Sequence, residues 1–217
     1  MNKEKQQSDF WDDYSEDFDA IYSHEKSKFN NLLDKVFRQD MYERFQFTIE
    51  ESQPISDRTI LDVGCGPGYY SLAYARQGAK KVIGIDYSEK MIRLANERMK
   101  KENLGGNCQF LVEDIKDYNP DLKFDISVAI GLFDYIKDPL PYLIKMRELT
   151  NEKIILTFPR LYTWRVPIRK IRLMIKKLDV YFYSKGRLKI LLESAGLKKY
   201  KIVDIGKLHC VVVFIDK

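Results

Sequence analysis

The chain contains few of the residues that form cross-links or hold soft metal ions. Among its 217 residues are three cysteines and two histidines. The cysteines, Cys65, Cys108 and Cys210, form no C-x-x-C pair. An odd number of cysteines without paired spacing indicates neither a disulfide framework nor a zinc site. We therefore expect reduced thiols and no bound metal ion.

Long apolar runs are also absent. No run approaches the roughly 20 residues of a membrane-spanning helix, and the first residues, MNKEKQQSDFWDD, lack the apolar core of a secretory signal. Hydrophobic residues make up 45% and charged residues 32% of the chain, which excludes a disordered or fibrous protein. The net charge of +5 is too small to indicate a nucleic-acid partner by itself. These features predict a soluble, cytoplasmic protein with the length of one domain, or of one domain and a cap.

The N-terminal part contains two amphipathic stretches. Aromatic and aliphatic residues recur at spacings of three and four between residues 10 and 22, and again over about 28–51. This is the period of a helix with one apolar face. Pro54 breaks the pattern. We therefore expect residues 1–58 to form a helical cap.

From Arg58 onward, short apolar runs alternate with helical stretches. Helices are predicted over about 69–77, 88–103, 139–150 and 184–195. The apolar runs among them read TILDV, KVIGID, CQFLVED, FDISVAIG and KIILTFP. Strands that alternate with helices form βαβ units with right-handed crossovers, and hence a parallel sheet.

Two further strand-like runs, YKIVDI and HCVVVFID, follow the last predicted helix. Only Gly206, Lys207 and Leu208 separate them. This gap is too short for a parallel crossover, so the two runs must form an antiparallel hairpin. Residues 59–217 are therefore predicted to form an α/β, doubly wound, mostly parallel seven-stranded sheet. Its last strand is antiparallel, and helices cover both faces.

A glycine-rich turn follows the first predicted strand. Residues 61–68 read LDVGCGPG, and a helix is expected to start near Tyr69. Glycine is needed where the backbone approaches a ligand closely or takes a positive φ, and a helix N-terminus offers free amide donors. A strand, a glycine turn and a helix in this order are the context that a nucleotide-type site requires.

Acidic residues end the next two strands. Asp86 follows Gly64 by 22 residues, close to the spacing of about 20 at which the dinucleotide fold places a carboxylate on a ribose. Asp114 ends the third predicted strand, where it can accept a hydrogen bond from an adenine amino group. Because the carboxyl ends of parallel strands share one edge, we expect the glycine turn and both carboxylates to meet there.

Residues 61–68 resemble the first signature motif of class I methyltransferases, which bind S-adenosylmethionine, and the resemblance extends over about residues 59–216. The third glycine comes one position earlier than in the NAD fingerprint, and the reversed terminal strand is typical of this family. These features, with Asp114, argue against an NAD-dependent oxidoreductase. The resemblance implies a cofactor site made by Asp62, Gly64, Cys65, Gly66, Gly68, Asp86, Tyr87, Asp114, Ile115, Gly131 and Leu132.

The residues of this implied site have distinct roles. The glycine turn would surround the methionine end of the cofactor, and the pair that begins with Gly131 would lie beside the transferred methyl group. Asp86 would hold the ribose, and Tyr87 would lie near the adenine. Asp114 and the backbone amide of Ile115 would bind the adenine edge.

Acceptor-side residues carry less specific signals. His209 opens the last strand, which runs backwards from the ligand edge. It is expected there as a general base, with an ordinary pKa of about 6.5, or as a polar rim residue. Tyr135 and Asp134 follow the fourth strand and either orient the acceptor or pack on the next helix. The N-terminal helix resembles the caps of small-molecule methyltransferases, which implies that Tyr14 and Tyr22 face the site.

A basic segment follows the fifth predicted strand. Residues 160–177 contain seven Lys and Arg residues and no Asp or Glu, and apolar residues recur there at spacings of four and three. This pattern predicts an amphipathic basic helix. Three interpretations stay open. In the first, the segment is a lid over about 160–180, with Trp164 and Arg165 on the acceptor side. In the second, residues 160–178 lie on an anionic membrane surface. In the third, the segment covers an anionic substrate.

No motif identifies the acceptor. The chain lacks the N/D-P-P-Y/F motif of amino-group methylation and the Pro-Cys pair of cytosine-C5 enzymes, which argues against a nucleic-acid acceptor. The cap, residues 133–135 and the lid are weakly similar to enzymes with planar or membrane-associated acceptors, such as magnesium-protoporphyrin O-methyltransferase. We therefore expect methyl transfer to a small or lipid-like acceptor, at oxygen or nitrogen. The alternatives are an RNA-directed methyltransferase that uses residues 160–177, and a cofactor-binding module without transfer activity.

Overall fold

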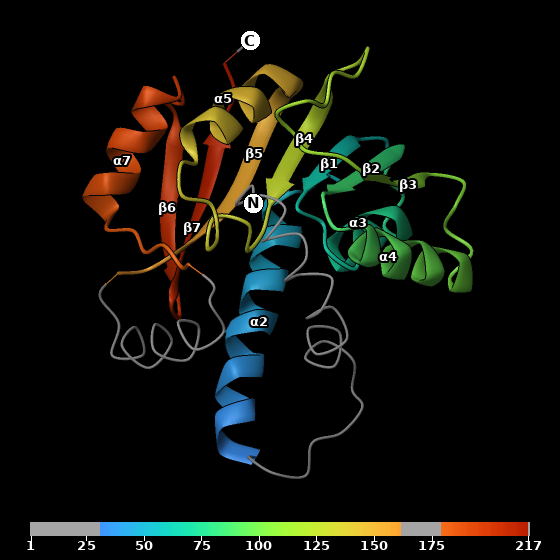
Figure 1. Ribbon diagram of the computed structural model, residues 1–217, viewed down its shortest axis with the longest axis horizontal. Helices are drawn as coiled ribbons and strands as arrows, with labels where there is room; N and C mark the ends of the chain where they lie inside the picture. The colour runs from blue at the N-terminus through green and yellow to red at the C-terminus, as the bar shows by residue number, and fades with distance from the viewer. Residues whose placement is uncertain (1–30, 162–178, 217) are drawn as a thin grey trace.

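The computed structural model describes residues 31–161 and 179–216 (Figure 1). Tyr14 and Tyr22, with the first expected helix of the cap, lie outside the described residues. So does most of the basic segment, including Trp164 and Arg165.

Seven strands form one sheet in the order β3-β2-β1-β4-β5-β7-β6 (Figure 1). Its strands are β1 (Thr59–Val63), β2 (Lys81–Asp86), β3 (Cys108–Val112), β4 (Phe124–Ala129), β5 (Thr150–Pro159), β6 (Tyr200–Ile205) and β7 (Leu208–Phe214). All neighbouring pairs are parallel except the two pairs that contain β7. This arrangement confirms the predicted, mostly parallel sheet with a reversed last strand.

The helices start and end within a few residues of their predicted limits. Those described are α2 (Asn31–Glu51), α3 (Tyr69–Arg76), α4 (Glu89–Lys101), α5 (Leu140–Leu149) and α7 (Lys185–Ser194). Serine caps begin two of them, because the hydroxyls of Ser88 and Ser184 accept from the amides of Met91 and Arg187. Within residues 31–161 and 179–216, no helix combines the length and apolar character needed to span a bilayer.

Helices cover both faces of the sheet, as predicted. Alternate residues along a strand point to opposite faces, and the two faces build two cores. Ile60 and Ile155 belong to the core under α2, α3 and α4. Leu61 and Ile154 belong to the core under α5 and α7. Successive apolar residues along a strand therefore belong to the two different layers of the protein.

Helix α2 belongs to the first of these layers. The core that contains residues of β1 and β4 also contacts three side chains of α2, those of Phe45, Phe47 and Ile49. The helix ends at Glu51, shortly before Pro54. Its N-terminal half extends beyond the carboxyl ends of the parallel strands (Figure 1). The division of the chain at residue 58 stays a prediction.

Candidate functional site

The glycine turn lies at the carboxyl end of β1. The amides of Gly64 and Cys65 donate to the Ile85 carbonyl at 2.8 and 3.1 Å, which attaches the turn to β2. Gly64, Gly66 and Gly68 have φ angles of 67°, 53° and 82°, in the left-handed region that favours glycine. Gly68 directly precedes α3 and, having no side chain, provides no side-chain cap for this helix.

The turn is open on one side and packed on the other. Among the described residues, no atom lies within 4 Å of a Cβ added at Gly66. A Cβ at Gly68 would lie 2.7 Å from the Phe110 ring, and one at Gly64 would lie 2.9 Å from the Leu132 side chain. The open space at Gly66 lets a ligand approach the backbone closely, as the sequence motif requires.

The carboxylate of Asp86 connects two backbone segments. Its Oδ2 accepts from the Gly66 amide at 2.9 Å, and its Oδ1 accepts from the Ser88 amide at 2.9 Å. The first bond holds the glycine turn, and the second holds the residue that caps α4. The sequence predicted a carboxylate at this edge. It did not indicate that Asp86 holds the turn, because this contact joins residues 20 positions apart.

Asp62 lies beneath the turn and is only 2% exposed. The Ser71 hydroxyl donates to its Oδ2 at 2.6 Å. Burial raises the pKa of Asp62 to about 7, and the hydrogen bonds from Ser71 oppose this rise. Asp62 therefore supports the turn from inside the protein.

The Cys65 side chain points into the core rather than toward the open side of the turn. Burial raises the pKa of its thiol, which disfavours the nucleophilic thiolate. Cys108 and Cys210 are also buried, and all three cysteines are free. A contact of Cys65 with a cofactor would therefore use its backbone.

A small pocket opens between the ends of β1, β2 and β3 and the turn after β4. The residues around it are Val63, Gly64, Ile85, Asp86, Tyr87, Glu113, Asp114, Ile115, Leu132 and Tyr142. The structure thus brings together the glycine turn, the residues at the ends of β2 and β3, and Leu132. Sequence reasoning missed Glu113 and Tyr142. Tyr142 comes from α5, where no motif or spacing marked it.

The turn after β4 packs directly on the glycine turn. Gly131 has a φ of 83°, and its amide donates to the Thr157 hydroxyl at 2.8 Å. The next residue, Leu132, fills the space in front of Gly64. Sequence segments 131–132 and 64–68 therefore meet at the switch point between β1 and β4, where open α/β sheets bind ligands.

Tyr135 and Asp134 have different surroundings. Burial raises the pKa of Tyr87, and Asp86, Tyr142 and Tyr135 are near enough to raise it further, so Tyr135 lies close to the pocket. Asp134 is only 5% exposed. Its carbonyl accepts from the Tyr181 amide at 2.9 Å. Tyr135 thus stays a candidate for contact with the acceptor, whereas Asp134 is packed inside the protein.

His209 lies at the expected edge of the sheet, where β7 pairs it with Phe158. The residue is 4% exposed. Its Nδ1 lies 2.6 Å from Asp204 Oδ1, and its Nε2 lies 3.2 Å from the Tyr183 carbonyl oxygen. Because both ring nitrogens face oxygens of the protein, neither is directed at a substrate. These contacts favour a structural role over the general base that the sequence suggested.

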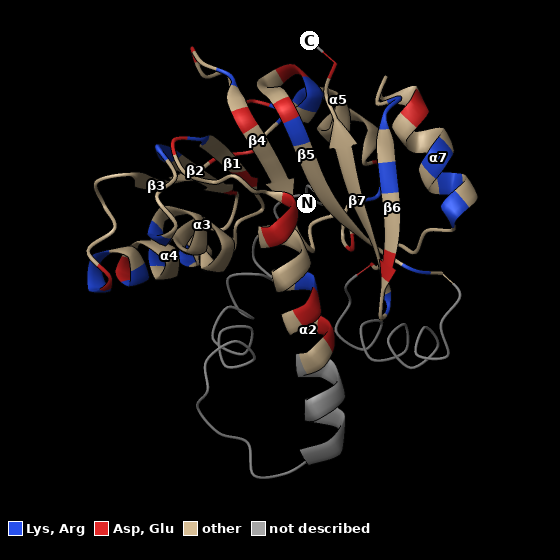
Figure 2. Cartoon of the chain, turned by 180° about the vertical axis from the view of Figure 1, so that it is seen from behind, with Lys and Arg blue, Asp and Glu red and all other residues tan. Residues whose placement is uncertain are grey.

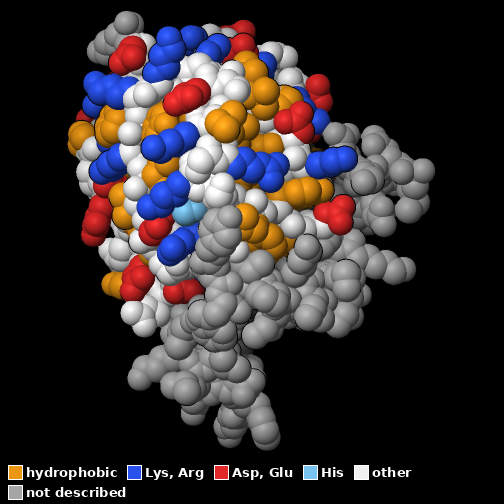
Figure 3. All heavy atoms as spheres, turned by 90° about the vertical axis from the view of Figure 1, so that its left-hand side faces the viewer, with side chains coloured by type: hydrophobic (Ala, Val, Ile, Leu, Met, Phe, Trp, Pro, Cys, Tyr) orange, Lys and Arg blue, Asp and Glu red, His pale blue; other side chains and the backbone are white. Residues whose placement is uncertain are grey.

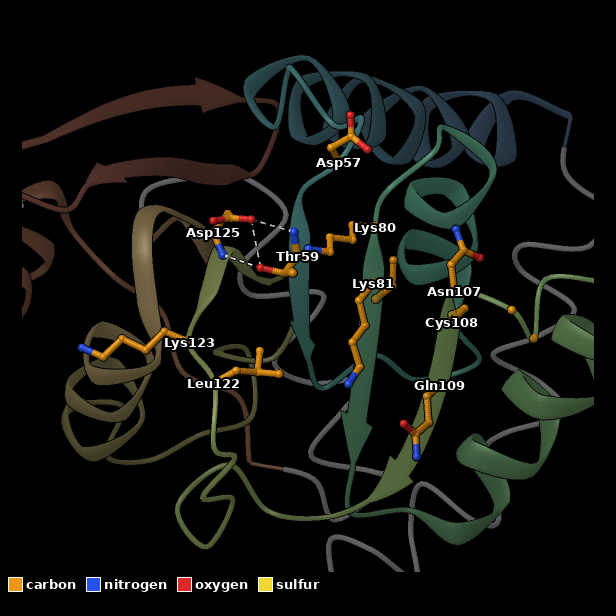
Figure 4. Close-up of a pocket in the computed structure, with 13 residues that line it drawn as sticks. Asp57, Thr59, Lys80, Lys81, Asn107, Cys108, Gln109, Leu122, Lys123 and Asp125 are labelled. Atoms are coloured by element: carbon orange, nitrogen blue, oxygen red, sulfur yellow. Dashed lines mark hydrogen bonds between the residues drawn. The ribbon is translucent and has the colours of Figure 1, made fainter.

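A larger cavity, of about 600 Å³, lies at the other end of the strands, where β1, β2, β3 and β4 begin (Figure 4). Lys81 and Gln109 line it from β2 and β3, and Asp125 accepts from the amide and hydroxyl of Thr59 there. None of the residues around it belongs to the glycine turn or to the carboxyl ends of the strands. We therefore place the functional site at the smaller pocket, where backbone donors and carboxylates converge.

Comparisons with known proteins show the family to which this chain is related. The family model described as "Methyltransferase domain" matches residues 55–176. The chain is 31% identical over 161 residues to a tRNA U34 carboxymethyltransferase of Pasteurella multocida, covering 70% of this chain and 49% of that protein. The chain thus spans about half the length of the curated relatives that it matches.

Solved structures share the fold at low sequence identity. Magnesium protoporphyrin IX methyltransferase from Synechocystis, with bound SAH, superposes with a TM-score of 0.80 at 17% identity, over 98% of this chain and 100% of that chain. A SAM-dependent methyltransferase from Aquifex aeolicus gives a TM-score of 0.61 at 22% identity, over 78% and 87% of the two chains.

The curated relatives correct two expectations from the sequence. They are named for the modification of a tRNA, which contradicts a small or lipid-like acceptor and the argument against nucleic acid. That argument relied on two missing motifs, and RNA modification does not require either of them. The family model covers more than half of the chain and shows that this protein belongs to the S-adenosylmethionine-dependent class I methyltransferases.

Proposed function

We propose that this protein is an S-adenosylmethionine-dependent methyltransferase whose acceptor is RNA, and tRNA in particular. The observation that carries the proposal is the name shared by relatives at 30% and 31% identity, tRNA U34 carboxymethyltransferase. Because the chain spans about half of those proteins, the proposal concerns the class of acceptor and leaves the modified position open. An acceptor of this class places the protein in the cytoplasm.

The pocket supports the cofactor half of the proposal. We assign the open side of the glycine turn to the methionine end of the cofactor, Asp86 to the ribose, and Asp114 with the Ile115 amide to the adenine. The adjacent turn at Gly131 then lies beside the reacting carbon. When bound, S-adenosylmethionine supplies an electrophilic methyl group on a sulfonium ion. The protein aligns the acceptor with that carbon and excludes water.

Basic residues support the acceptor half. Helix α7 begins with Lys185 and Arg187, has no acidic residue in its first turn and has no basic residue in its last turn. The helix dipole favours the opposite distribution, so these cations do not stabilise the helix through its dipole. Lys185 pairs with Asp204, and the Arg187 guanidinium lies 5.1 Å from the centre of the Tyr183 ring. Both cations can also attract the phosphates of a polyanionic ligand.

The same cations lie at the edge of the sheet that carries the cofactor pocket. Arg160 follows β5 and forms an isolated β-bridge with Tyr183, a residue shortly before α7. Lys and Arg residues recur along α7 and β6 (Figure 2), and basic side chains gather on the face of the molecule that is on the left in Figure 1 (Figure 3). Asp204 lies 3.0 Å from Lys185 and 3.5 Å from Arg160, and one carboxylate between two cations leaves a net positive charge. In the sequence, this surface adjoins the acid-free residues 160–177.

The test combines binding and transfer. Wild-type protein should incorporate labelled methyl groups from S-adenosylmethionine into tRNA, and tRNA binding should weaken steeply with salt. In the double variant Lys185→Gln, Arg187→Gln, the slope of log affinity against log salt should fall by roughly 1–2, because about two phosphate contacts are lost. Affinity for S-adenosylhomocysteine should stay unchanged.

A matched control removes two cations from α4, away from α7 and β6. Lys100 and Lys101 are exposed in the last turn of α4, so Lys100→Gln, Lys101→Gln makes the same change in net charge. It should retain the wild-type salt slope. Equal losses in both double variants would indicate only a general charge effect. Cofactor binding without methyl transfer to RNA would refute the proposed acceptor.

A further inference from the structure

A second concave site lies at the amino ends of the parallel strands, away from the cofactor pocket. The cavity of about 600 Å³ there is lined by residues at the beginnings of β1, β2 and β3 and in the segments that precede these strands and β4 (Figure 4). Its volume falls within the roughly 300–1,000 Å³ of pockets that hold small molecules. The cavity is therefore large enough for a ligand of its own.

One wall of this cavity is a polar part of a sheet face that is apolar elsewhere. Thr59 and Lys81 are register partners at the beginnings of β1 and β2. Two residues further along these strands, on the same face, Leu61 and Ile83 belong to the core under α5 and α7. Gln109 of β3 pairs with Ile83, and the side chains of Lys81 and Gln109 are exposed. The helices of this layer therefore leave the amino end of the face open.

Cations outnumber carboxylates around the open face. The lysines that line the cavity are Lys80, Lys81 and Lys123, and the carboxylates are Asp57 and Asp125. Within residues 31–161 and 179–216, no ion pair joins any of these lysines to a carboxylate. Asp125 Oδ2 accepts from the amide and the hydroxyl of Thr59 at 2.8 and 2.9 Å, so this carboxylate serves the pairing of β1 with β4. The lysines therefore make the cavity attractive to an anion.

Part of the cavity wall has no side chains. Gly105 and Gly106 precede β3 and line the cavity. No atom in the described part of the chain lies within 4 Å of a Cβ added at Gly106. A ligand can therefore approach the backbone closely at this point.

We propose that this cavity binds a phosphorylated small molecule and that Lys80, Lys81 and Lys123 hold its phosphate group. A phosphate monoester carries about −1.5 to −2 charges at pH 7 and three acceptor oxygens, and lysine ammonium groups bind phosphate as point charges. A single carboxylate carries less charge and gains less from three cations. The inference goes beyond the proposed function and does not rest on it, because the cavity shares no residue with the cofactor pocket or with the cations of α7.

The experiment is a calorimetric titration with ribose 5-phosphate, and with ribose as the same sugar without phosphate. Saturating S-adenosylhomocysteine keeps the cofactor pocket occupied. Wild-type protein should bind ribose 5-phosphate, less tightly as salt is added, and should not bind ribose. In the double variant Lys81→Gln, Lys123→Gln, the affinity for ribose 5-phosphate should fall by about tenfold or more, because two charge-assisted contacts are lost. Both positions are exposed, so the variant should fold.

The matched control is the double variant Lys185→Gln, Arg187→Gln, which makes the same change in net charge at α7. It should bind ribose 5-phosphate as tightly as the wild type does. Conversely, Lys81→Gln, Lys123→Gln should keep the wild-type salt dependence of tRNA binding. This crossed pattern would establish two separate sites.

Three results would overturn the inference and leave the proposed function intact. Wild-type protein that binds ribose 5-phosphate no better than ribose would remove the phosphate site. Equal losses in the two double variants would reduce the effect to overall charge. Weaker tRNA binding in Lys81→Gln, Lys123→Gln, without ribose 5-phosphate binding to the wild type, would assign these lysines to the RNA backbone.

Discussion

Asp62 and Asp86 are two carboxylates at one end of the sheet with different chemistry. Both oxygens of Asp86 accept hydrogen bonds from backbone amides, at Gly66 and Ser88. Asp62 is buried beneath the turn, and burial raises its pKa more than the hydrogen bonds from Ser71 lower it. The two residues are alike in type and position, so their surroundings decide what each carboxylate does.

This difference predicts the pH dependence of stability. Burial raises the pKa of Asp62 from its ordinary value of 3.8 to about 7 in the folded protein, so the folded state binds the extra proton between these values. The free energy of unfolding should fall as pH rises from about 4 to about 7, by as much as roughly 4 kcal/mol from this group. Asp62→Asn should remove that part of the decline. Urea unfolding at a series of pH values measures it.

An exposed aspartate provides the control for this prediction. Asp121 lies in a surface loop, and Asp121→Asn should leave the shape of the wild-type profile unchanged. The stability of Asp62→Asn relative to wild type should increase across the interval and stay constant above it. Parallel profiles for Asp62→Asn and wild type would show that Asp62 does not titrate in this range.

At the scale of elements, the glycine turn, β3 and α4 are packed through Gly68. A Cβ there would lie 2.7 Å from the Phe110 ring and 3.1 Å from Ala95 Cβ, and the φ angle of 82° is unfavourable for alanine. Gly68→Ala should therefore destabilise the protein by about 2 kcal/mol or more, from backbone strain and overpacking together. Chemical denaturation measures this loss.

Gly66 is the matched comparison for Gly68. Its φ angle of 53° is also left-handed, but an added Cβ would meet no atom of residues 31–161 and 179–216 within 4 Å. Gly66→Ala should destabilise the protein less than Gly68→Ala, and it should weaken S-adenosylhomocysteine binding because the Cβ enters the space assigned to the cofactor. Unchanged affinity in Gly66→Ala would remove the open side of the turn from the cofactor site.

At the scale of the whole molecule, the proposed cofactor pocket is lined by residues from the ends of several strands, so a bound cofactor should stabilise the fold as a unit. At about a hundred times its Kd, a ligand that binds only the folded state adds about 2.7 kcal/mol to the free energy of unfolding. For a chain of this size, the corresponding rise in Tm is roughly 5–10 °C. Thermal unfolding with S-adenosylhomocysteine should show this shift, whereas NAD should produce none. The reverse result would contradict the assigned pocket.

Much of this architecture was predictable because it leaves local signals in the sequence. Short apolar runs located the strands, and the short gap at 206–208 required an antiparallel pair. The positions of the glycine turn, Asp86 and Asp114 then followed from chain direction alone, because the carboxyl ends of parallel strands meet at one edge.

Other features depended on contacts between segments far apart in the chain. Arg44 reaches Tyr70 across 26 positions, and Tyr142 joins the pocket from α5. His209 has both nitrogens directed at Asp204 and Tyr183, although its position suggested a general base. Sequence periodicity determines which face of an element is buried and where each strand ends. Only the packing of those elements against one another decides which side chains meet, because each such contact depends on two distant segments at once.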